Sequence, residues 1–176
     1  MNTTDYGKYV PEIVNALNAL SCQGLPNSRP IWTKRIKDAL AAIGTRSRLH
    51  VCPGNAPGDE HEWLYDLVWY RNNENSRLEQ VPLVLESEWN MDPYDIRVDF
   101  EKLLVATSPL KVMVCQNHAD KVKETLTSLE CGINEYLFGV RSIYILACYS
   151  PDGSRVEIRT LKKEPDKAAE PMHLNT

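Results

Sequence analysis

Three acidic residues stand in stretches of the sequence that are otherwise apolar. Glu86 and Glu88 lie inside the segment VPLVLESEW, and Asp66 lies twenty residues before Glu86, inside HEWLYDLVWY. A segment this apolar is typical of a strand inside a sheet, where an unpaired carboxylate is strongly destabilising. Residues two apart on a strand project from the same face, so Glu86 and Glu88 would be separated by roughly 7 Å. The pattern therefore indicates a site for chemistry, because a purely structural strand gains nothing from these charges.

A cluster of these three carboxylates would favour a divalent cation. If the two segments pair as strands, the carboxylates share one patch of sheet and repel, and one takes up a proton unless a cation lies among them. Hard oxygen ligands with no histidine nearby favour Mg²⁺ or Mn²⁺ over zinc. We therefore expect Asp66, Glu86 and Glu88 to bind magnesium, with manganese as a substitute. The opposing interpretation is an edge strand whose acidic face meets only solvent.

The elements that must position these residues alternate between helices and strands. Apolar residues at helical spacing predict helices at about 5–20, 33–44, 95–107 and 122–132. Apolar or alternating runs predict strands at 48–52, 61–70, 81–89, 110–116, 142–150 and 155–161. Alternation places Asp66 on the same strand face as Val68, and Glu86 and Glu88 on the same face as Val84. The predicted fold class is α/β, with a central mixed sheet flanked by helices.

Length and composition fit one ordinary domain. The 176 residues predict a single domain over 1–162, and the polar, aperiodic residues 163–176 predict a disordered tail. The net charge of −4 argues against a protein whose whole surface is positively charged, such as a histone-like nucleic-acid binder. Five widely spaced cysteines without a Cys-x-x-Cys pair lack a zinc-finger or disulfide signature, and Cys115 and Cys148 are expected to be buried. With neither a leader-like start nor an apolar membrane span, we expect a cytoplasmic protein without a membrane partner.

The motif and the order of the elements resemble the PD-(D/E)XK nuclease superfamily. Asp66, then Glu86-Ser87-Glu88 in an apolar strand, then a helix with DFEKLL and a strand LKVMV are similar to its core of helix, three strands, helix and strand (αβββαβ), over residues 33–116. The resemblance implies a restriction-endonuclease-like core, with an extra N-terminal helix and extra C-terminal strands. It also implies a magnesium-dependent phosphodiesterase with Asp66 and Glu86 as the acidic residues of the motif.

The sequence departs from the family pattern at Glu88, where the family usually has lysine. One group of type II restriction endonucleases carries Glu-Ser-Glu at this place, as this chain does. Two hypotheses about the missing lysine stay open. Either Glu88 itself handles the attacking water, or a lysine arrives from elsewhere, with Lys102 on the following helix and Lys111 on the next strand as candidates. The plain alternative for Lys102 is a solvated residue on a helix flank.

The function that the resemblance implies is a divalent-metal-dependent endonuclease acting on nucleic acid, and we expect DNA as the substrate, although the sequence itself does not decide between DNA and RNA. Asp66 and Glu86 would hold the ion, and Glu88 would accept a proton or help hold a second ion. Glu60, Glu62 and Asp38 are further candidates for the ligand shell. The tryptophans at positions 63, 69 and 89 are expected in the core.

Two alternatives to an active nuclease stay open. One is a catalytically inactive nuclease fold that serves as a binding or regulatory protein, which the missing lysine favours. The other is an interaction domain whose acidic sheet face binds no ligand. We expect no separate target-recognition domain in a chain of this length, and a homodimer stays open.

Overall fold

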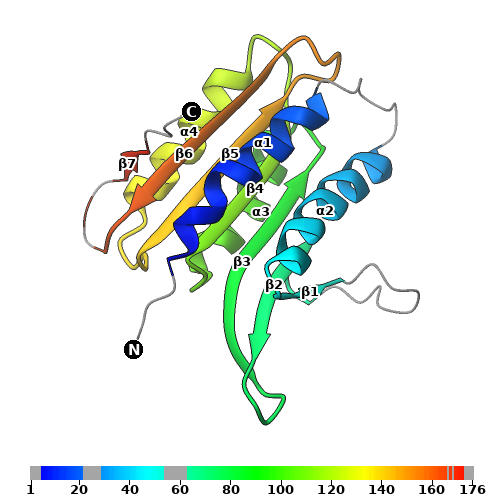
Figure 1. Ribbon diagram of the computed structural model, residues 1–176. Helices are drawn as coiled ribbons and strands as arrows, with labels where there is room; N and C mark the ends of the chain where they lie inside the picture. The colour runs from blue at the N-terminus through cyan, green and yellow to red at the C-terminus, as the bar shows by residue number, and fades with distance from the viewer. Residues whose placement is uncertain (1–4, 22–28, 54–62, 166, 168, 173–176) are drawn as a thin grey trace.

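One seven-stranded sheet runs through the structure, a computed structural model that describes residues 5–21, 29–53, 63–165, 167 and 169–172. The sheet order is β1-β2-β3-β4-β5-β6-β7 (Figure 1). Its strands are β1 (His50–Cys52), β2 (Leu67–Asn72), β3 (Leu78–Glu88), β4 (Leu110–Gln116), β5 (Ser142–Tyr149), β6 (Val156–Lys163) and β7 (Glu170–Pro171).

The orientation of the strands changes in the middle of the sheet. Strands β1, β2 and β3 form an antiparallel meander, whereas β3, β4 and β5 are parallel neighbours. Strands β6 and β7 continue in antiparallel order. Parallel neighbours need a crossover connection, and here α3 (Pro93–Val105) joins β3 to β4, while α4 (Val122–Glu135) joins β4 to β5. The carboxyl ends of β3, β4 and β5 therefore lie at the same edge of the sheet.

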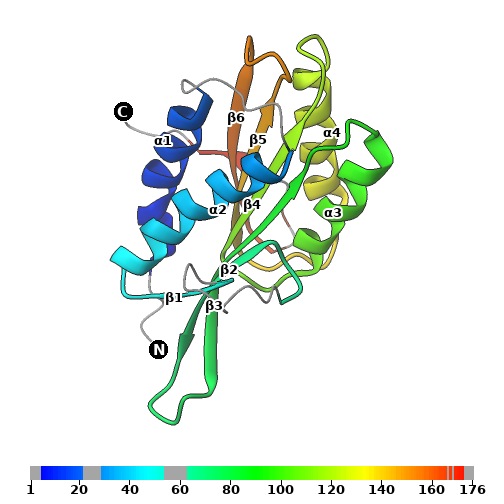
Figure 2. The ribbon, with the colours of Figure 1, turned by 90° about the vertical axis from the view of Figure 1, so that its right-hand side faces the viewer.

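Helices cover both faces of the sheet and enclose two separate cores. The short helix η1 (Tyr6–Tyr9), α1 (Val10–Ser21) and α2 (Arg29–Arg46) lie on one face, and α3 and α4 lie on the other (Figure 2). Side chains alternate along each strand, so Leu67 and Leu85 enter the core under α1 and α2, whereas Val68 and Val84 enter the core under α3 and α4.

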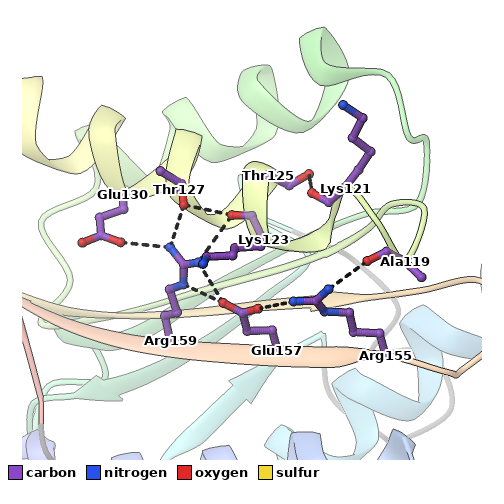
Figure 3. A network of polar contacts seen from close by, with 9 residues as sticks. All are labelled: Ala119, Lys121, Lys123, Thr125, Thr127, Glu130, Arg155, Glu157 and Arg159. Carbon is purple, nitrogen blue, oxygen red and sulfur yellow. Dashed lines mark hydrogen bonds and ion pairs between the residues drawn. The ribbon is translucent and has the colours of Figure 1, made fainter.

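Charged side chains fasten α4 to the antiparallel end of the sheet. Arg159 of β6 donates to Glu157 at 2.8 Å and to Glu130 of α4 at 3.1 Å (Figure 3). Its guanidinium also reaches the hydroxyl of Thr127 at 3.1 Å. Because Arg159 keeps only 20% of its side chain exposed, these ion pairs are screened less than pairs in open solvent. They hold the second crossover helix against the strand next to β5.

The hairpin between β2 and β3 extends beyond the rest of the sheet (Figures 1 and 2). Its turn is built from its own residues: the Asn73 side chain accepts from the backbone N–H groups of Asn75 and Arg77, and Ser76 adopts a φ of 58°. The register shifts beyond Trp69 as the hairpin leaves the sheet. Its tip lies at the opposite end of β3 from Glu86 and Glu88.

The expected α/β class with a central mixed sheet flanked by helices is confirmed, including the N-terminal helix and the strands after β4. The opposing interpretation, an acidic edge strand, is wrong for Glu86, because β3 has neighbours on both sides. None of the described helices is long and apolar enough to cross a membrane.

Two predicted boundaries also need correction. The strand predicted at 61–70 begins only at Leu67, because residues 64–66 bend, and residues 61–62 lie outside the described part. The predicted disordered tail 163–176 is wrong where it is described: β6 runs to Lys163, and Glu170–Pro171 pairs with it as β7.

Gly44 lies inside α2, although its residue type suggested that the helix would end there. The helix continues to Arg46, and the buried Trp69 ring lies against the helix at Gly44. Its indole nitrogen donates to the Leu40 carbonyl at 3.1 Å. A Cβ on Gly44 would stand only 2.7 Å from that nitrogen. Glycine is required here by the close approach of the ring.

Replacing Gly44 with alanine should destabilise the protein by about 1–2 kcal/mol. Helix propensity alone would favour alanine by ~1 kcal/mol, but a contact this close to a fully buried ring places the cost of overpacking in the upper part of its usual range, ~2–3 kcal/mol. Urea denaturation measures the difference in the free energy of unfolding. The control is Thr45→Ala on the exposed side of the same helix, expected within ~0.5 kcal/mol of wild type. A Gly44→Ala variant as stable as wild type would contradict the packing argument.

Candidate active site

Asp66 meets β3 at the point where the pairing of β2 with β3 stops. The last pair at this end of the ladder is Leu67 with Leu85, so the backbone N–H of Ser87 lacks a partner carbonyl on β2. The Asp66 carboxylate replaces it, since Oδ2 accepts from the Ser87 backbone N–H at 2.8 Å and from its hydroxyl at 2.5 Å. These bonds use only one of the two carboxylate oxygens. Asp66 is thereby fixed beside the segment Glu86–Glu88.

Glu86 is the buried carboxyl of the site. Only 3% of the residue is exposed, and among the described residues its Oε1 atom is buried without a hydrogen-bond partner. Burial raises its pKa to about 8; the charge of Lys102 opposes this rise, and the charges of Asp66 and Asp99 add to it. The charge of Asp66, the other acid of the motif, thus acts on Glu86 in the same direction as burial.

Helix α3 brings a lysine to this carboxyl. The Lys102 ammonium lies 3.5 Å from Glu86 Oε2 and 2.7 Å from Asp99 Oδ1, one helical turn earlier. Burial lowers the pKa of Lys102. The hydrogen bond to Asp99 and the charges of both acids raise it by more than burial lowers it, so the net shift of the pKa is upward. The lysine is charged at neutral pH and is shared between the sheet and its own helix. Its side chain is nevertheless 45% exposed, so a substrate can reach it.

Glu88 lies on the same face, at the end of β3. Its Oε1 accepts from the Asn90 backbone N–H at 2.5 Å. Burial raises the pKa of Glu88, the bond from Asn90 lowers it, and the neighbouring Asp99 raises it again. Asp99 pairs with Lys102 and its charge raises the pKa of both glutamates, so the site comprises Asp66, Glu86, Glu88, Asp99 and Lys102.

The second lysine candidate lies apart from the acids. Lys111 pairs opposite Val84 on β4, and its ammonium contacts Tyr144 Oη at 3.1 Å and the Leu104 carbonyl at 3.5 Å. No carboxylate of the described residues lies within ion-pair distance of it. Burial lowers its pKa to about 8. Lys111 donates to a backbone carbonyl at the carboxyl end of α3. Of the two candidate lysines, Lys102 is therefore the one that belongs to the site.

The other proposed ligands are not assembled at the site. Asp38 lies on α2, on the opposite face of the sheet, and pairs with Lys34 at 3.0 Å, so its assignment to the ligand shell is wrong. Glu60 and Glu62 lie outside the described residues. Among the tryptophans expected in the core, positions 69 and 89 are buried, but Trp63 is 47% exposed because the chain bends ahead of β2.

Sequence reasoning missed Asp99, a member of the site, and the position of Tyr65 near it. Asp99 resembles any acid on a helix surface, although its spacing of three from Lys102 is a signal for an ion pair on one face. Strict alternation along the strand predicts that Tyr65 faces away from Asp66, but alternation fails where residues 64–66 bend. Its ring packs against the core under α3, and its pKa is raised by burial and by the charge of Glu86.

The oxygen atoms of the site are of the kind that binds a hard cation, but they are not arranged as a complete set of ligands around one position. Glu86 offers a buried oxygen without a partner, and Asp66 offers the oxygen that Ser87 does not use. Carboxylate oxygens are the ligands that Mg²⁺ and Mn²⁺ prefer. No group of three His, Cys, Asp or Glu side chains within the described ranges is arranged to hold a metal ion. In this arrangement the Lys102 ammonium is the cation nearest to Glu86.

The raised pKa of Glu86 predicts how stability depends on pH. The folded state holds this proton up to about pH 8 and the unfolded chain only up to about 4.5, so unfolding releases a proton in between and stability falls as the pH rises. In chelator at pH 9, Glu86→Gln should therefore be more stable than wild type by roughly 2 kcal/mol, less than the whole shift implies because Lys102 and solvent screen the charge.

Denaturant titrations at several pH values measure this difference. It should shrink toward pH 4, where wild-type Glu86 is protonated. The matched control is Glu79→Gln at an exposed position of the same strand, which should follow wild type throughout. A difference for Glu86→Gln that stays constant with pH would show that its origin is packing and not charge.

No family model, curated protein or solved structure matches the chain. The candidate site is therefore defined by the contacts described above and by the motif resemblance in the sequence.

Proposed function

We propose that the protein is a divalent-metal-dependent phosphodiesterase, an endonuclease with a restriction-endonuclease-like core that acts on DNA. The observation that carries this proposal is Glu86: a buried carboxyl with one oxygen lacking a partner, set beside Asp66 and reached by Lys102. The order α2, β1, β2, β3, α3, β4, with β3 parallel to β4, follows the expected αβββαβ core. The acids also lie toward the carboxyl end of β3, the edge of open α/β sheets where ligands bind.

Each residue of the site has a definite task in phosphodiester hydrolysis. Asp66 and Glu86 would hold the Mg²⁺ or Mn²⁺ ion, which supplies neutralising charge to the phosphate and a lowered pKa to a bound water. Lys102 would place its ammonium against a phosphate oxygen, where negative charge develops in the transition state. Glu88, whose pKa is raised, is poised to take the proton of the attacking water. Asp99 would hold Lys102 in place.

The position of Lys102 favours the hypothesis that the missing lysine comes from α3. Its ammonium already lies at the buried carboxyl, so no large movement is needed. Glu88, by contrast, has one oxygen engaged by the Asn90 backbone. Both residues can still act together, Lys102 on the phosphate and Glu88 on the water.

A second candidate function is that of a nuclease fold that binds without cutting. The observation that favours it is the same ion pair, since Lys102 stabilises Glu86 without any metal. In such a protein the lysine would permanently replace the ion. Metal binding and cleavage, measured separately, distinguish the two functions.

Magnesium or manganese should bind at the site and support cleavage of DNA. The measurement is incubation of the full chain with plasmid DNA, single-stranded DNA and RNA, each with the ion and with chelator. Glu86→Gln and Asp66→Asn should abolish metal-dependent cleavage. An ion present at ten times its Kd and bound only to the folded state raises the free energy of unfolding by about 1.4 kcal/mol, a gain that both variants should lose.

Glu79→Gln again serves as the control and should keep both cleavage and the metal-induced gain. A wild-type chain that gains stability from the ion but cuts none of the three substrates would favour the binding protein. A chain that does neither would favour an interaction domain.

Variants at Lys102 and Glu88 separate the two lysine hypotheses. If Lys102 supplies the positive charge, Lys102→Ala should lower kcat by about 10²–10³-fold, as removal of one transition-state donor does, while the melting temperature stays within a few degrees. If Glu88 acts alone, Glu88→Ala should show that loss and Lys102→Ala should not. Arg97→Ala, an exposed position on the same helix, is the control. Full activity in both variants would remove both assignments.

A further inference from the structure

Three aromatic rings form a row on the sheet face that carries the candidate site. The Tyr70 ring contacts two others, those of His50 of β1 and of Trp63, with ring centroids 5.0 Å and 4.9 Å away. The angles between the ring planes are 24° for His50 and 38° for Trp63. We call His50, Tyr70 and Trp63 the aromatic row.

The aromatic row lies beside the carboxylates and on their side of the sheet. Tyr70 packs against the core under α3 and α4, the core that also contains Val84, a neighbour of Glu86 on the same strand face. Helix α3 packs on β3 and β4, so it covers the acids but leaves the outer strands β1 and β2 to the row. Tyr70 follows Asp66 by four residues, and four residues of extended chain span roughly 13 Å, the order of the distance between row and site.

The exposure of Trp63 distinguishes it from the other tryptophans. Tryptophans 32, 69 and 89 are each 6% exposed or less, whereas Trp63 keeps 47% of its surface open. Contact with Tyr70 nevertheless holds the Trp63 ring against the sheet. The result is a supported aromatic surface that faces solvent next to a group of acids.

We infer that the aromatic row binds an unpaired base of a single-stranded nucleic acid while the phosphate to be cut lies at Glu86. This inference rests on the proposed function and specifies its substrate class. Every base has a flat π-face that stacks on aromatic side chains, whereas in a duplex each base is paired and stacked on its neighbours. At roughly 3.4 Å per base step, the stacked base lies a few nucleotides from the phosphate at Glu86. The protein should therefore prefer single-stranded DNA or an unpaired stretch over intact duplex.

Tryptophan fluorescence tests the inference directly, because Trp63 is the exposed one of the four tryptophans. The full chain in chelator, and the Glu86→Gln variant with magnesium, are titrated with a short single-stranded DNA and with the same sequence as a duplex. Single strands should quench the fluorescence and bind more tightly than duplex. Trp63→Ala should weaken single-strand binding by roughly five- to hundredfold, and Trp63→Phe should restore most of it.

Leu64→Ala is the matched control. Leu64 is the next residue after Trp63, it is 81% exposed, and it lies outside the aromatic row. It should bind like wild type. Equal binding by Trp63→Ala and wild type, or no binding of single strands by either protein, would overturn the inference.

Cleavage distinguishes a failure of this inference from a failure of the proposed function. If wild type cuts single strands and duplex equally and Trp63→Ala cuts both as well, the protein is a nuclease but the row does not select its substrate. If single strands quench Trp63 and nothing is cut, the row binds nucleic acid and the proposed hydrolysis is wrong.

Discussion

A carboxyl group buried in the middle of the sheet is the constraint around which this structure is arranged. Glu86 lies on β3, the strand at which antiparallel pairing changes to parallel pairing, and it is 3% exposed. A charge there is destabilising unless a cation or a proton compensates it. The chain supplies both means: Lys102 lies 3.5 Å away, and the pKa of Glu86 is raised to about 8. The charge of Glu86 can thus be compensated in three ways: by a proton, by Lys102 or by an external cation.

The local order of the chain makes this compensation direct. Helix α3 starts five residues after β3 ends, with Asp92 capping its first turn, and it runs back over the strand that it follows. Asp99 and Lys102, one turn apart, thereby come to lie over Glu86 and Glu88. The return of the chain through β4 places Lys111 under the end of the same helix, where it contacts the Leu104 carbonyl and not the acids. One crossover unit therefore determines which lysine belongs to the site.

The sequence predicts those parts of the molecule that depend on local pattern. Apolar context singles out Glu86, and alternation correctly assigns Val68 and Val84 to one core and Leu67 and Leu85 to the other. It fails where the chain leaves a regular element, so Tyr65 and Trp63 were assigned to the wrong surroundings. Asp99 was missed because the rotation of a helix about its own axis over a sheet is set by tertiary packing. The pairing of β7 with β6 also depends on residues distant in sequence, as does the position of Gly44 beside Trp69.

The long hairpin between β2 and β3 keeps its turn far from the acids, although both lie on the same pair of strands. Its tip is closed by bonds among residues 73–77, and it lies at the end of β3 away from Glu86. The acids at the other end receive no support from the tip, and the tip receives none from them. The turn is therefore a permissive place to insert a peptide tag or a fluorescent reporter, which gives a handle on the intact protein without disturbing its carboxylates.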